Sequence, residues 1–514
     1  MSGRPSRFVL DMSAGFALVL AIGVVYLVDV NLPQASNSQS RGGGAGSGRG
    51  SLLGNPIRSD SIYAQRAAPK KQRVKLVKEK GGTAVSEKAV RDGLDWLSRH
   101  QKNDGSWSRT CLMAGPDSQC DRDGHCSGPG SHFDMAHTGL VVLAFQGGGH
   151  FHFNKTKYSQ QVRDGLEWIV KNQKKDGGLY TTQGHHLMYE HGIATFALLE
   201  ACALDVAAGR KPLREWRQAA ERAVRYIEKM QHNDGGWRYT ATKTRPSDTS
   251  VSGWQVLALK TALEAGIDFD PQVVPKAKAF FESCEQGRTG ITNYTTNRRN
   301  THATTGVGML AHQFLFGTPD SRLVKSASGV LADFAEATYG PRISSPNDYY
   351  LWYNCTLAMF QAGGENWKRW NGVVRDKVVG LQEHDGCARG SWPPNGRFAG
   401  TGGRIYSTAL AVLSLEVYYR FRGTRKKKGR PKGKGARRRR GARKANCRVT
   451  GRSPAWTLPR PTLHRKRMWT IPSRDQTNGR RRLILPQNLW NAPFSIPSRS
   501  TRNGPLRTCN ARRS

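Results

Sequence analysis

The 514-residue sequence lacks the short motifs that mark several common kinds of active site. It has no Gly-rich phosphate-binding loop and no G-x-S-x-G nucleophile elbow. Its Cys and His residues match no standard zinc spacing, and the stretch "DRDG" lacks the rest of a calcium-binding loop. These absences argue against a nucleotide phosphate site and a serine hydrolase of the α/β type, and we predict no metal site and no cofactor.

Acidic residues are scarce at both ends of the chain. The sequence has 80 Lys and Arg residues against 38 Asp and Glu, and residues 423–514 contain 28 basic residues and one acidic residue. We predict a flexible basic linker over residues 34–82 and a disordered Arg/Lys-rich tail over 423–514, both suited to anionic surfaces. A misread reading frame is the alternative for the tail. The high net charge therefore says little about the middle of the chain.

Long apolar runs are also missing, apart from one near the N-terminus. This run extends from Met12 to Val28, and Arg4 and Arg7 precede it. A bilayer core needs roughly 20 apolar residues, and no convincing cleavage site follows the run. We predict a signal anchor over residues 1–33, with a signal peptide as the alternative. Basic residues stay in the cytoplasm, so the rest of the chain would lie on the extracytoplasmic (periplasmic) side of the membrane.

Three of the nine cysteines, Cys111, Cys120 and Cys126, lie close together in the sequence. In an oxidising compartment a local disulfide is the expected state of such a group. Metal binding is the alternative, because His and Asp residues lie in the same stretch. The sequence leaves the choice between the two open.

A short motif recurs through the middle of the chain. "QHNDGGW" at 231–237 has near-copies at 101–107, 173–180 and, with an insertion, 382–392. The first three copies end stretches with the apolar spacing of amphipathic helices. More apolar helices rich in small residues are expected between the copies. In them a small residue precedes a large apolar one by four positions, at Gly139/Leu143, Gly192/Phe196, Gly253/Leu257, Gly306/Leu310, Cys355/Met359 and Ala409/Leu413.

Six helix pairs of this kind predict a closed double ring. An amphipathic helix must bury one stripe, whereas the apolar helices need cover on nearly every side. Outer helices around an inner ring satisfy both needs, and a closed ring has no ends that require capping. We therefore predict an all-α fold, an (α/α)6 toroid over residues 83–422; an open superhelix is the alternative.

The motif itself has the composition of a helix end and a turn. Glycines suit the left-handed conformation that ends helices, aspartates bond to nearby backbone in turns, and the tryptophans would wedge between helices. We therefore interpret the repeated Asp as structural and not as catalytic. The residues concerned are Asp104, Asp176, Asp234 and Asp385, with Gly105, Gly177, Gly235 and Gly386, and Trp107, Trp237 and Trp392.

These Gln-x-x-Asp-Gly-x-Trp repeats resemble those of the squalene–hopene cyclase and protein prenyltransferase superfamily. Members include cyclases, transferases and proteins that are not enzymes. The resemblance implies that an Asp-x-Asp-Asp-Thr acid would open an inner helix, and "PSDTSVSGW" occupies that place. Asp248 and Thr249 remain, but the companion acids of this pattern are absent. The Asp-x-Cys zinc motif of the prenyltransferases is absent, so whether the chain is an enzyme stays open.

In a closed ring the N-termini of all inner helices open at one mouth, where polar residues gather. Converging acids, histidines and an arginine in a concave site are the default site hypothesis, although Asp residues there also suit N-caps. We predict that Asp248, His302 and His191 are catalytic. The predicted ligand-binding residues are Asp134, His137, Glu190, Ser250, Asp348, Tyr350, Trp352, Arg404 and Tyr406.

The sequence favours a membrane-anchored protein of the cyclase or prenyltransferase type that acts on or binds an isoprenoid or other apolar small molecule at this mouth. The alternatives are a non-catalytic binding or scaffold module for a peptide, glycan or lipid, and a polysaccharide lyase or hydrolase on the same barrel. Aromatic residues at the mouth, such as Trp254 and Tyr350, could stabilise a carbocation. The oligomeric state is not predicted.

Overall fold

The computed structural model describes residues 61–421, except 114–117, 121–125, 127, 183, 244–245 and 341–345. The predicted anchor at 1–33, residues 34–60 of the predicted linker, and the predicted basic tail lie outside these residues. Within the described part of the chain, no helix combines the length and the apolar character needed to cross a bilayer.

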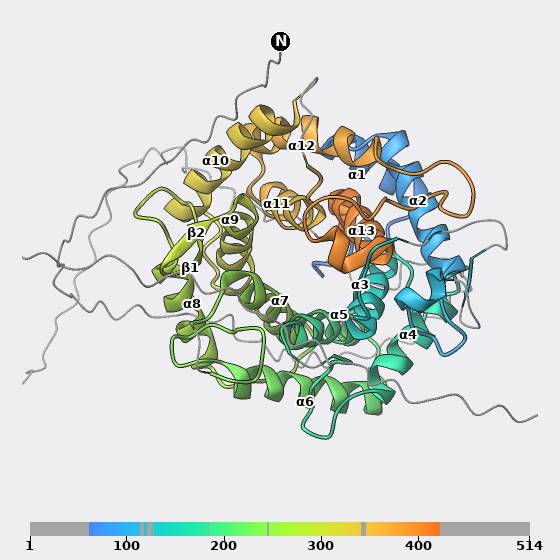
Figure 1. Ribbon diagram of the computed structural model, residues 1–514, viewed down its shortest axis with the longest axis horizontal. Helices are drawn as coiled ribbons and strands as arrows, with labels where there is room; N and C mark the ends of the chain where they lie inside the picture. The colour runs from blue at the N-terminus through green and yellow to red at the C-terminus, as the bar shows by residue number, and fades with distance from the viewer. Residues whose placement is uncertain are drawn as a thin grey trace, which may run out of the picture. The chain divides into compact units, whose positions relative to one another are not determined.

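The described chain is mostly helical and alternates between outer and inner helices (Figure 1). The outer helices are α2 (Ala84–Arg99), α4 (Ser159–Lys171), α6 (Arg214–Met230), α8 (Val273–Ser283), α10 (Arg322–Tyr339) and α12 (Gly364–Val379). The inner helices are α3 (Asp134–Gly147), α5 (Leu187–Ala207), α7 (Thr249–Glu264), α9 (His302–Leu310), α11 (Tyr349–Ala362) and α13 (Ala399–Leu415).

Shorter elements join these pairs. A 3-10 turn, η1 (Arg109–Leu112), follows α2, and a π-helical turn, η2 (Ala311–Leu315), extends α9. β1 (Asn293–Thr295) and β2 (Arg298–Asn300) form a small antiparallel hairpin between α8 and α9. The helices α1 (Lys70–Lys80) and α14 (Val417–Arg420) lie at the two ends of the described chain and contact each other.

The inner helices form a closed ring. Each packs on the next along the chain, and the last, α13, packs on the first, α3. The outer ring closes in the same place, because α12 contacts α2 (Figure 1). The prediction of six helix pairs in a closed toroid is therefore confirmed for the described residues, and the open superhelix is excluded.

Side-chain patterns explain the two rings. On α6 one face is buried, with Trp216, Val224 and Ile227 among its members, while α3 is buried from Met135 through Gly147. Small residues let the inner helices approach closely: a Cβ on Gly139 would lie 3.1 Å from the backbone of Ala194 in α5. Large residues at such positions would separate the inner helices.

The repeated motif joins neighbouring outer helices, as predicted. Each motif Gln donates two hydrogen bonds of 2.8–3.0 Å, one to a carbonyl in its own turn and one to the adjacent outer helix. The acceptors are Gly105 and Gln161 for Gln101, Gly177 and Ala219 for Gln173, Gly235 and Val273 for Gln231, and Gly390 and Ala89 for Gln382. The last of these pairs closes the ring.

The last repeat corrects one detail of the prediction. Gly390, not Gly386, occupies the turn position of Gly105: it has φ 93°, and a Cβ there would lie 2.3 Å from the carbonyl oxygen of Asp92 in the adjacent helix. A Cβ on Gly386 would meet nothing within 4 Å. Residues 386–389 therefore form an insertion, which displaces Asp385 from the turn as well.

The predicted linker is wrong for residues 61–82. Tyr63 and Arg66 are fully buried, and Arg66 Nη1 lies 2.9 Å from Glu200 Oε1 of α5. Arg420 of α14 pairs with the same carboxylate at 3.3 Å. The basic composition of residues 61–82 suggested a solvated segment. Arg66 is buried instead, because the buried carboxylate of Glu200 pairs with it.

Candidate functional site

An aromatic cavity opens at the end of the toroid where the inner helices begin. Its volume is about 340 Å³, within the roughly 300–1,000 Å³ of small-molecule sites. The first turns of α3, α5, α7, α11 and α13 supply most of the wall. The aromatic and histidine side chains that line it are Phe133, His137, His185, His186, Tyr189, Tyr239, Trp254, Tyr350, Phe398 and Tyr406.

Burial keeps the tyrosines of this wall uncharged. Desolvation raises the pKa of Tyr189, Tyr350 and Tyr406 above the usual value of tyrosine, and neighbouring aspartates add to the effect. The ring of Trp254 stacks on Tyr353 with centroids 5.7 Å apart, which fixes its orientation. The cavity therefore offers neutral π-faces on a rigid support.

Five of the predicted residues line this cavity: His137, Glu190, Ser250, Tyr350 and Tyr406. His137 Nε2 lies 2.8 Å from the carbonyl oxygen of Gly402, so this nitrogen carries the proton. Burial lowers the pKa of His137. The imidazole is therefore neutral and is held between α3 and α13.

Glu190 is buried, and its carboxylate accepts hydrogen bonds from the loop that precedes its helix. The hydroxyl and backbone N–H groups of Thr181 and Thr182 donate to its two carboxylate oxygens, Thr181 Oγ1 at 2.6 Å. Burial raises its pKa, and these four donors oppose the rise. Glu190 thus shapes the rim of the cavity by holding the loop, with little capacity left for a ligand.

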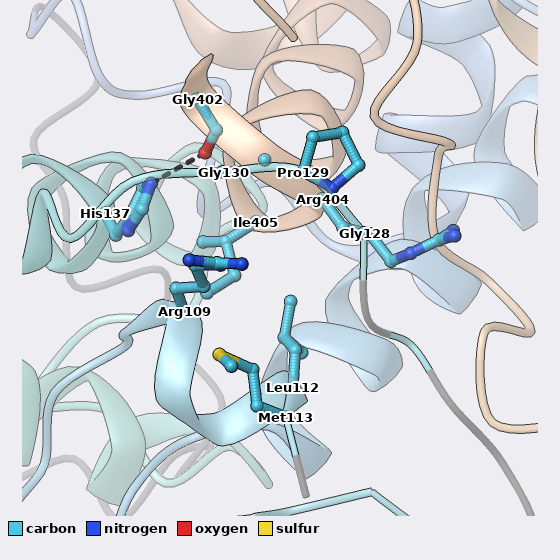
Figure 2. Close-up of a pocket in the computed structure, with 11 residues that line it drawn as sticks. Arg109, Leu112, Met113, Gly128, Pro129, Gly130, His137, Gly402, Arg404 and Ile405 are labelled. Carbon is cyan, nitrogen blue, oxygen red and sulfur yellow. Dashed lines mark hydrogen bonds between the residues drawn. The ribbon is translucent and has the colours of Figure 1, made fainter. Parts of the chain in front are cut away.

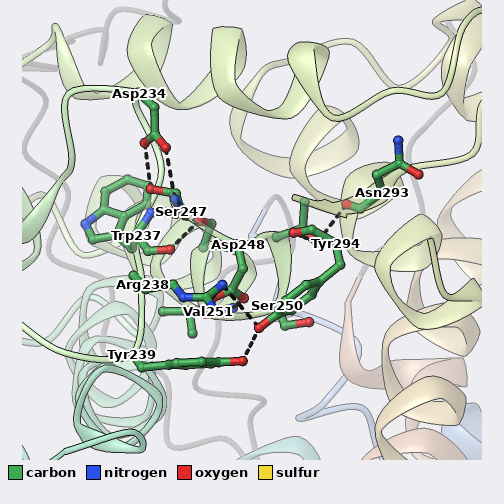
Figure 3. A network of polar contacts seen from close by, with 12 residues as sticks. Asp234, Trp237, Arg238, Tyr239, Ser247, Asp248, Ser250, Val251, Asn293 and Tyr294 are labelled. Carbon is green, nitrogen blue, oxygen red and sulfur yellow. Dashed lines mark hydrogen bonds and ion pairs between the residues drawn. The ribbon is translucent and has the colours of Figure 1, made fainter. Parts of the chain in front are cut away.

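Asp248 is the N-cap residue of α7 and belongs to a network of polar contacts (Figure 3). Its Oδ1 accepts from the backbone N–H of Val251 at 2.9 Å, and its Oδ2 lies 3.2 Å from Arg238 Nη1. Burial raises the pKa of this carboxyl to about 7, although the Val251 amide and Arg238 oppose the shift. It does not line the cavity, whereas its neighbour Ser250 does.

A pair of tyrosine hydroxyls connects Asp248 to the cavity. The hydroxyls of Tyr239 and Tyr294 are hydrogen-bonded to each other, and Tyr239 lines the cavity. Arg238 Nη1 lies 3.4 Å from the Tyr294 hydroxyl and also contacts Asp248 (Figure 3). This polar network can orient the wall of the cavity, and it connects Asp248 to the cavity only through Arg238, Tyr294 and Tyr239.

His191 has a structural position and does not line the cavity. Its Nδ1 accepts from the backbone N–H of Leu179 at 3.1 Å. In other repeats the same backbone group bonds to a hydroxyl, as in Trp107 to Thr138 and Trp237 to Ser252. His191 therefore replaces a Ser or Thr of the repeat, and burial lowers its pKa to about 3.

His302 and Trp352 point away from the cavity as well. The imidazole of His302 stacks on Phe334 of outer helix α10, with centroids 3.6 Å apart. Trp352 is fully buried and packs edge-on against Tyr339 and Tyr349. The structure does not bring either side chain to the other predicted residues, because both lie on the outward faces of their helices.

The remaining predicted residues hold the mouth together. Asp134 Oδ1 accepts from Ser108 Oγ at 2.7 Å, and Asp348 caps α11 through the N–H of Leu351 at 2.9 Å. Burial raises the pKa of Asp348 to about 6. Arg404 donates to the Cys126 carbonyl oxygen at 3.0 Å. The capping interpretation that the sequence left open thus describes Asp348 but not Asp134, because α3 has Phe133 at its N-cap and no side-chain capping bond.

Arg404 lines a second, much smaller pocket next to the cavity (Figure 2). Its volume of about 10 Å³ is close to that of one buried water. Arg109 also lines it, and His137 and Gly402 separate it from the aromatic cavity. The pocket is too small for an organic ligand.

Several residues of the cavity were not predicted from the sequence. Tyr239 follows the motif Trp237 by two positions, and Phe398 precedes α13. Phe398 is 51% exposed and has φ 61°, a conformation that is uncommon for a residue other than glycine. Phe398, as an aromatic residue directly before an inner helix, could have been found from the sequence.

The cysteines correct a further expectation. All seven described cysteines are free thiols, so the predicted local disulfide among Cys111, Cys120 and Cys126 is absent. Cys111 Sγ contacts the Ser108 carbonyl oxygen at 2.7 Å instead.

Comparisons with known proteins agree with this fold. The family model described as squalene-hopene cyclase C-terminal domain matches residues 142–268. A squalene–hopene cyclase of Bradyrhizobium diazoefficiens is 27% identical over 199 residues, which are 36% of this chain and 27% of that protein. A probable squalene–hopene cyclase of Sinorhizobium fredii is 27% identical over 227 residues, 41% and 32% of the two chains. These matches show that the middle of the chain is similar to squalene–hopene cyclases.

The match of this squalene cyclase-like chain covers no more than about a third of either relative's length. Among solved structures, the matches include a type II terpene cyclase from Scytonema in complex with merosterolic acid A, at 13% identity and a TM-score of 0.42, covering 64% of this chain and 96% of that one. An α-1,6-mannanase of Salegentibacter sp. in complex with α-1,6-mannotriose has 10% identity and a TM-score of 0.45, covering 65% and 98%.

Proposed function

We propose that this chain binds an apolar, isoprenoid-like small molecule in the aromatic cavity. The observation that carries the proposal is the wall itself: neutral aromatic rings and aliphatic side chains surround about 340 Å³ at the mouth of the toroid. Binding sites of this kind hold apolar ligands by burial and orient them with few polar groups. The partly exposed Phe398 at the rim gives an apolar chain a path inward.

The proposal is binding, and it assigns no proton-initiated cyclisation to Asp248. A pKa of about 7 makes this carboxyl a weak acid. Its oxygens already interact with Arg238 and with the backbone N–H of Val251 in α7. A strong acid would need partners that stabilise its charged form. With the predicted anchor over residues 1–33, we propose that the chain presents the cavity beside a membrane, where isoprenoid lipids partition.

A cavity-filling substitution tests the proposal. Ala136 lines the cavity, so Ala136→Trp should displace the ligand, while Ala337→Trp on the exposed face of α10 should leave it in place. The full-length protein and both variants are purified in mild detergent, and copurifying compounds are extracted and identified by mass spectrometry. We expect an isoprenoid-like compound that falls at least about 10-fold in the Ala136 variant alone.

Equal amounts of ligand in the two variants would show that the cavity is not the binding site. Recovery of an oligosaccharide in place of an apolar compound would favour the glycan alternative and would overturn the proposal. Circular dichroism of each variant checks that the helical fold is retained.

A further inference from the structure

Four metal-ligating side chains meet where the first and last hairpins of the ring join. His100 ends α2, Cys120 and Cys126 lie between η1 and α3, and Cys387 lies between α12 and α13. The four ligand atoms, one imidazole nitrogen and three sulfurs, all lie within 4.8 Å of one another. His100, Cys126 and Cys387 are buried, and Cys120 is partly exposed.

Atoms this close together can surround a single tetrahedral ion. Zn–S bonds of about 2.3 Å and Zn–N bonds of about 2.0 Å place neighbouring ligand atoms about 3.5–3.8 Å apart. Cys387 Sγ lies 3.5 Å from His100 Nε2. All three cysteines are free thiols, so each sulfur is available to a metal.

Trp96 orients two of the four ligands. Its carbonyl oxygen accepts from His100 Nδ1 at 2.7 Å, which leaves the lone pair on Nε2, the nitrogen nearest Cys387. Its indole Nε1 donates to Cys126 Sγ at 3.4 Å, a bond that favours the thiolate. The indole also stacks on the His100 ring at 4.3 Å. Partners of this kind commonly fix the tautomer and direction of metal ligands.

The sequence departs from its own repeat where two of these ligands stand. His100 immediately precedes the motif Gln of the first repeat, and the equivalent residues in the other clear repeats are Asn172, Met230 and Leu381. Cys387 belongs to the insertion at 386–389, which the other clear copies of the motif lack. The insertion brings the sulfur of Cys387 to the first repeat. A metal site would give the insertion a structural role.

We propose that His100, Cys120, Cys126 and Cys387 bind one zinc ion that fastens the last hairpin of the toroid to the first. Four protein ligands leave no open position for a substrate, which is the arrangement of structural zinc sites. None of the four residues lines the aromatic cavity. The ion would therefore stabilise ring closure and take no part in binding the ligand proposed above.

Metal analysis of the full-length protein tests this site. The chain is produced in zinc-supplemented medium, purified without chelator and measured by plasma mass spectrometry. We expect about one zinc per chain, falling below about 0.2 in Cys126→Ser and in Cys387→Ser. Cys111→Ser is the matched control, because Cys111 is buried in the same region but does not belong to the cluster; it should keep its zinc.

A second measurement separates loss of metal from loss of fold. Folded wild-type protein is stripped with a chelator and reloaded with Co²⁺, whose visible absorption reports tetrahedral thiolate ligation. We expect the Tm to fall on stripping and to recover when zinc is returned. A wild-type protein that neither carries nor takes up zinc or cobalt would overturn the proposal. So would a Cys120–Cys126 disulfide found by peptide mapping, or equal loss of zinc in Cys111→Ser.

Discussion

At the scale of single residues, Asp248 shows how burial changes the chemistry of a predicted acid. The unfolded chain releases the proton of an Asp near pH 4, but the folded chain retains it until about pH 7. Between these values the unfolded state binds fewer protons than the folded state, so this group makes the protein less stable as the pH rises. Its contribution is complete below about pH 4 and is lost above about pH 7.

Replacing Asp248 with asparagine should remove this pH dependence while preserving the cap of α7, since Asn is also a good N-cap. Urea unfolding of the wild type and of Asp248→Asn at pH 4 and pH 7 measures the effect. We expect the free energy of unfolding of the wild type to fall relative to the variant by up to roughly 4 kcal/mol across this range. Parallel profiles for the two proteins would contradict the assigned pKa.

Residue types predicted the site only in part. Of the polar residues predicted at the starts of the inner helices, Tyr350 and Tyr406 are among those that line the cavity. His191 and His302 were wrong choices as cavity residues, because one replaces a repeat hydroxyl and the other faces an outer helix. The direction of a side chain depends on its helix's rotation in the ring, which a single sequence does not fix.

At the scale of the helix pair, the motif Gln links each outer helix to the next outer helix through hydrogen bonds. Gln231 Nε2 bonds to Gly235 O at 2.8 Å and to Val273 O at 3.0 Å, and both bonds are buried. Periodicity and turn chemistry predicted the helix pairs and the structural role of this motif. They failed in the last repeat, because an insertion in a turn shifts the glycine that the turn requires from 386 to 390.

Removing one such link should destabilise the toroid without changing its helix content. Gln231→Ala leaves two buried carbonyl oxygens without this donor, at a cost of about 1–3 kcal/mol in the free energy of unfolding. The control is Gln160→Ala, since Gln160 is exposed and bonds only to Asp164 within its own helix. Denaturant unfolding compares the two, and equal midpoints would refute the role of the link.

At the scale of the whole molecule, a buried charge cluster ties the segment before the toroid to its last residues. Arg66 and Arg420 both pair with Glu200, and all three side chains are fully buried. This cluster could not be predicted from the sequence, because its members are separated by 134 and 220 positions. The cluster at the junction of the first and last hairpins was predicted only in part, because metal binding was left open for Cys120 and Cys126, whereas His100 and Cys387 lie far from them in the sequence.

Breaking this cluster from one side should be costly. Arg66→Ala leaves Glu200 buried with one cation fewer, and removing one partner of a buried pair costs about 3–5 kcal/mol. Arg225→Ala on the exposed face of α6 is the control and should change the free energy of unfolding by less than about 0.5 kcal/mol. Thermal and urea unfolding measure both, and a small effect of Arg66→Ala would mean that Arg420 alone suffices.

The bond from Gln382 to Ala89 spans 293 positions of the chain. During synthesis α2 therefore has no partner on one side until α12 has left the ribosome, several hairpins later. Until then the apolar surface of α2 on that side is exposed and can associate with other chains. Contacts so distant in sequence also form slowly. A chain whose translation stops after α10 would consequently form an open ring, and the exposed apolar surface of its first hairpin would promote aggregation.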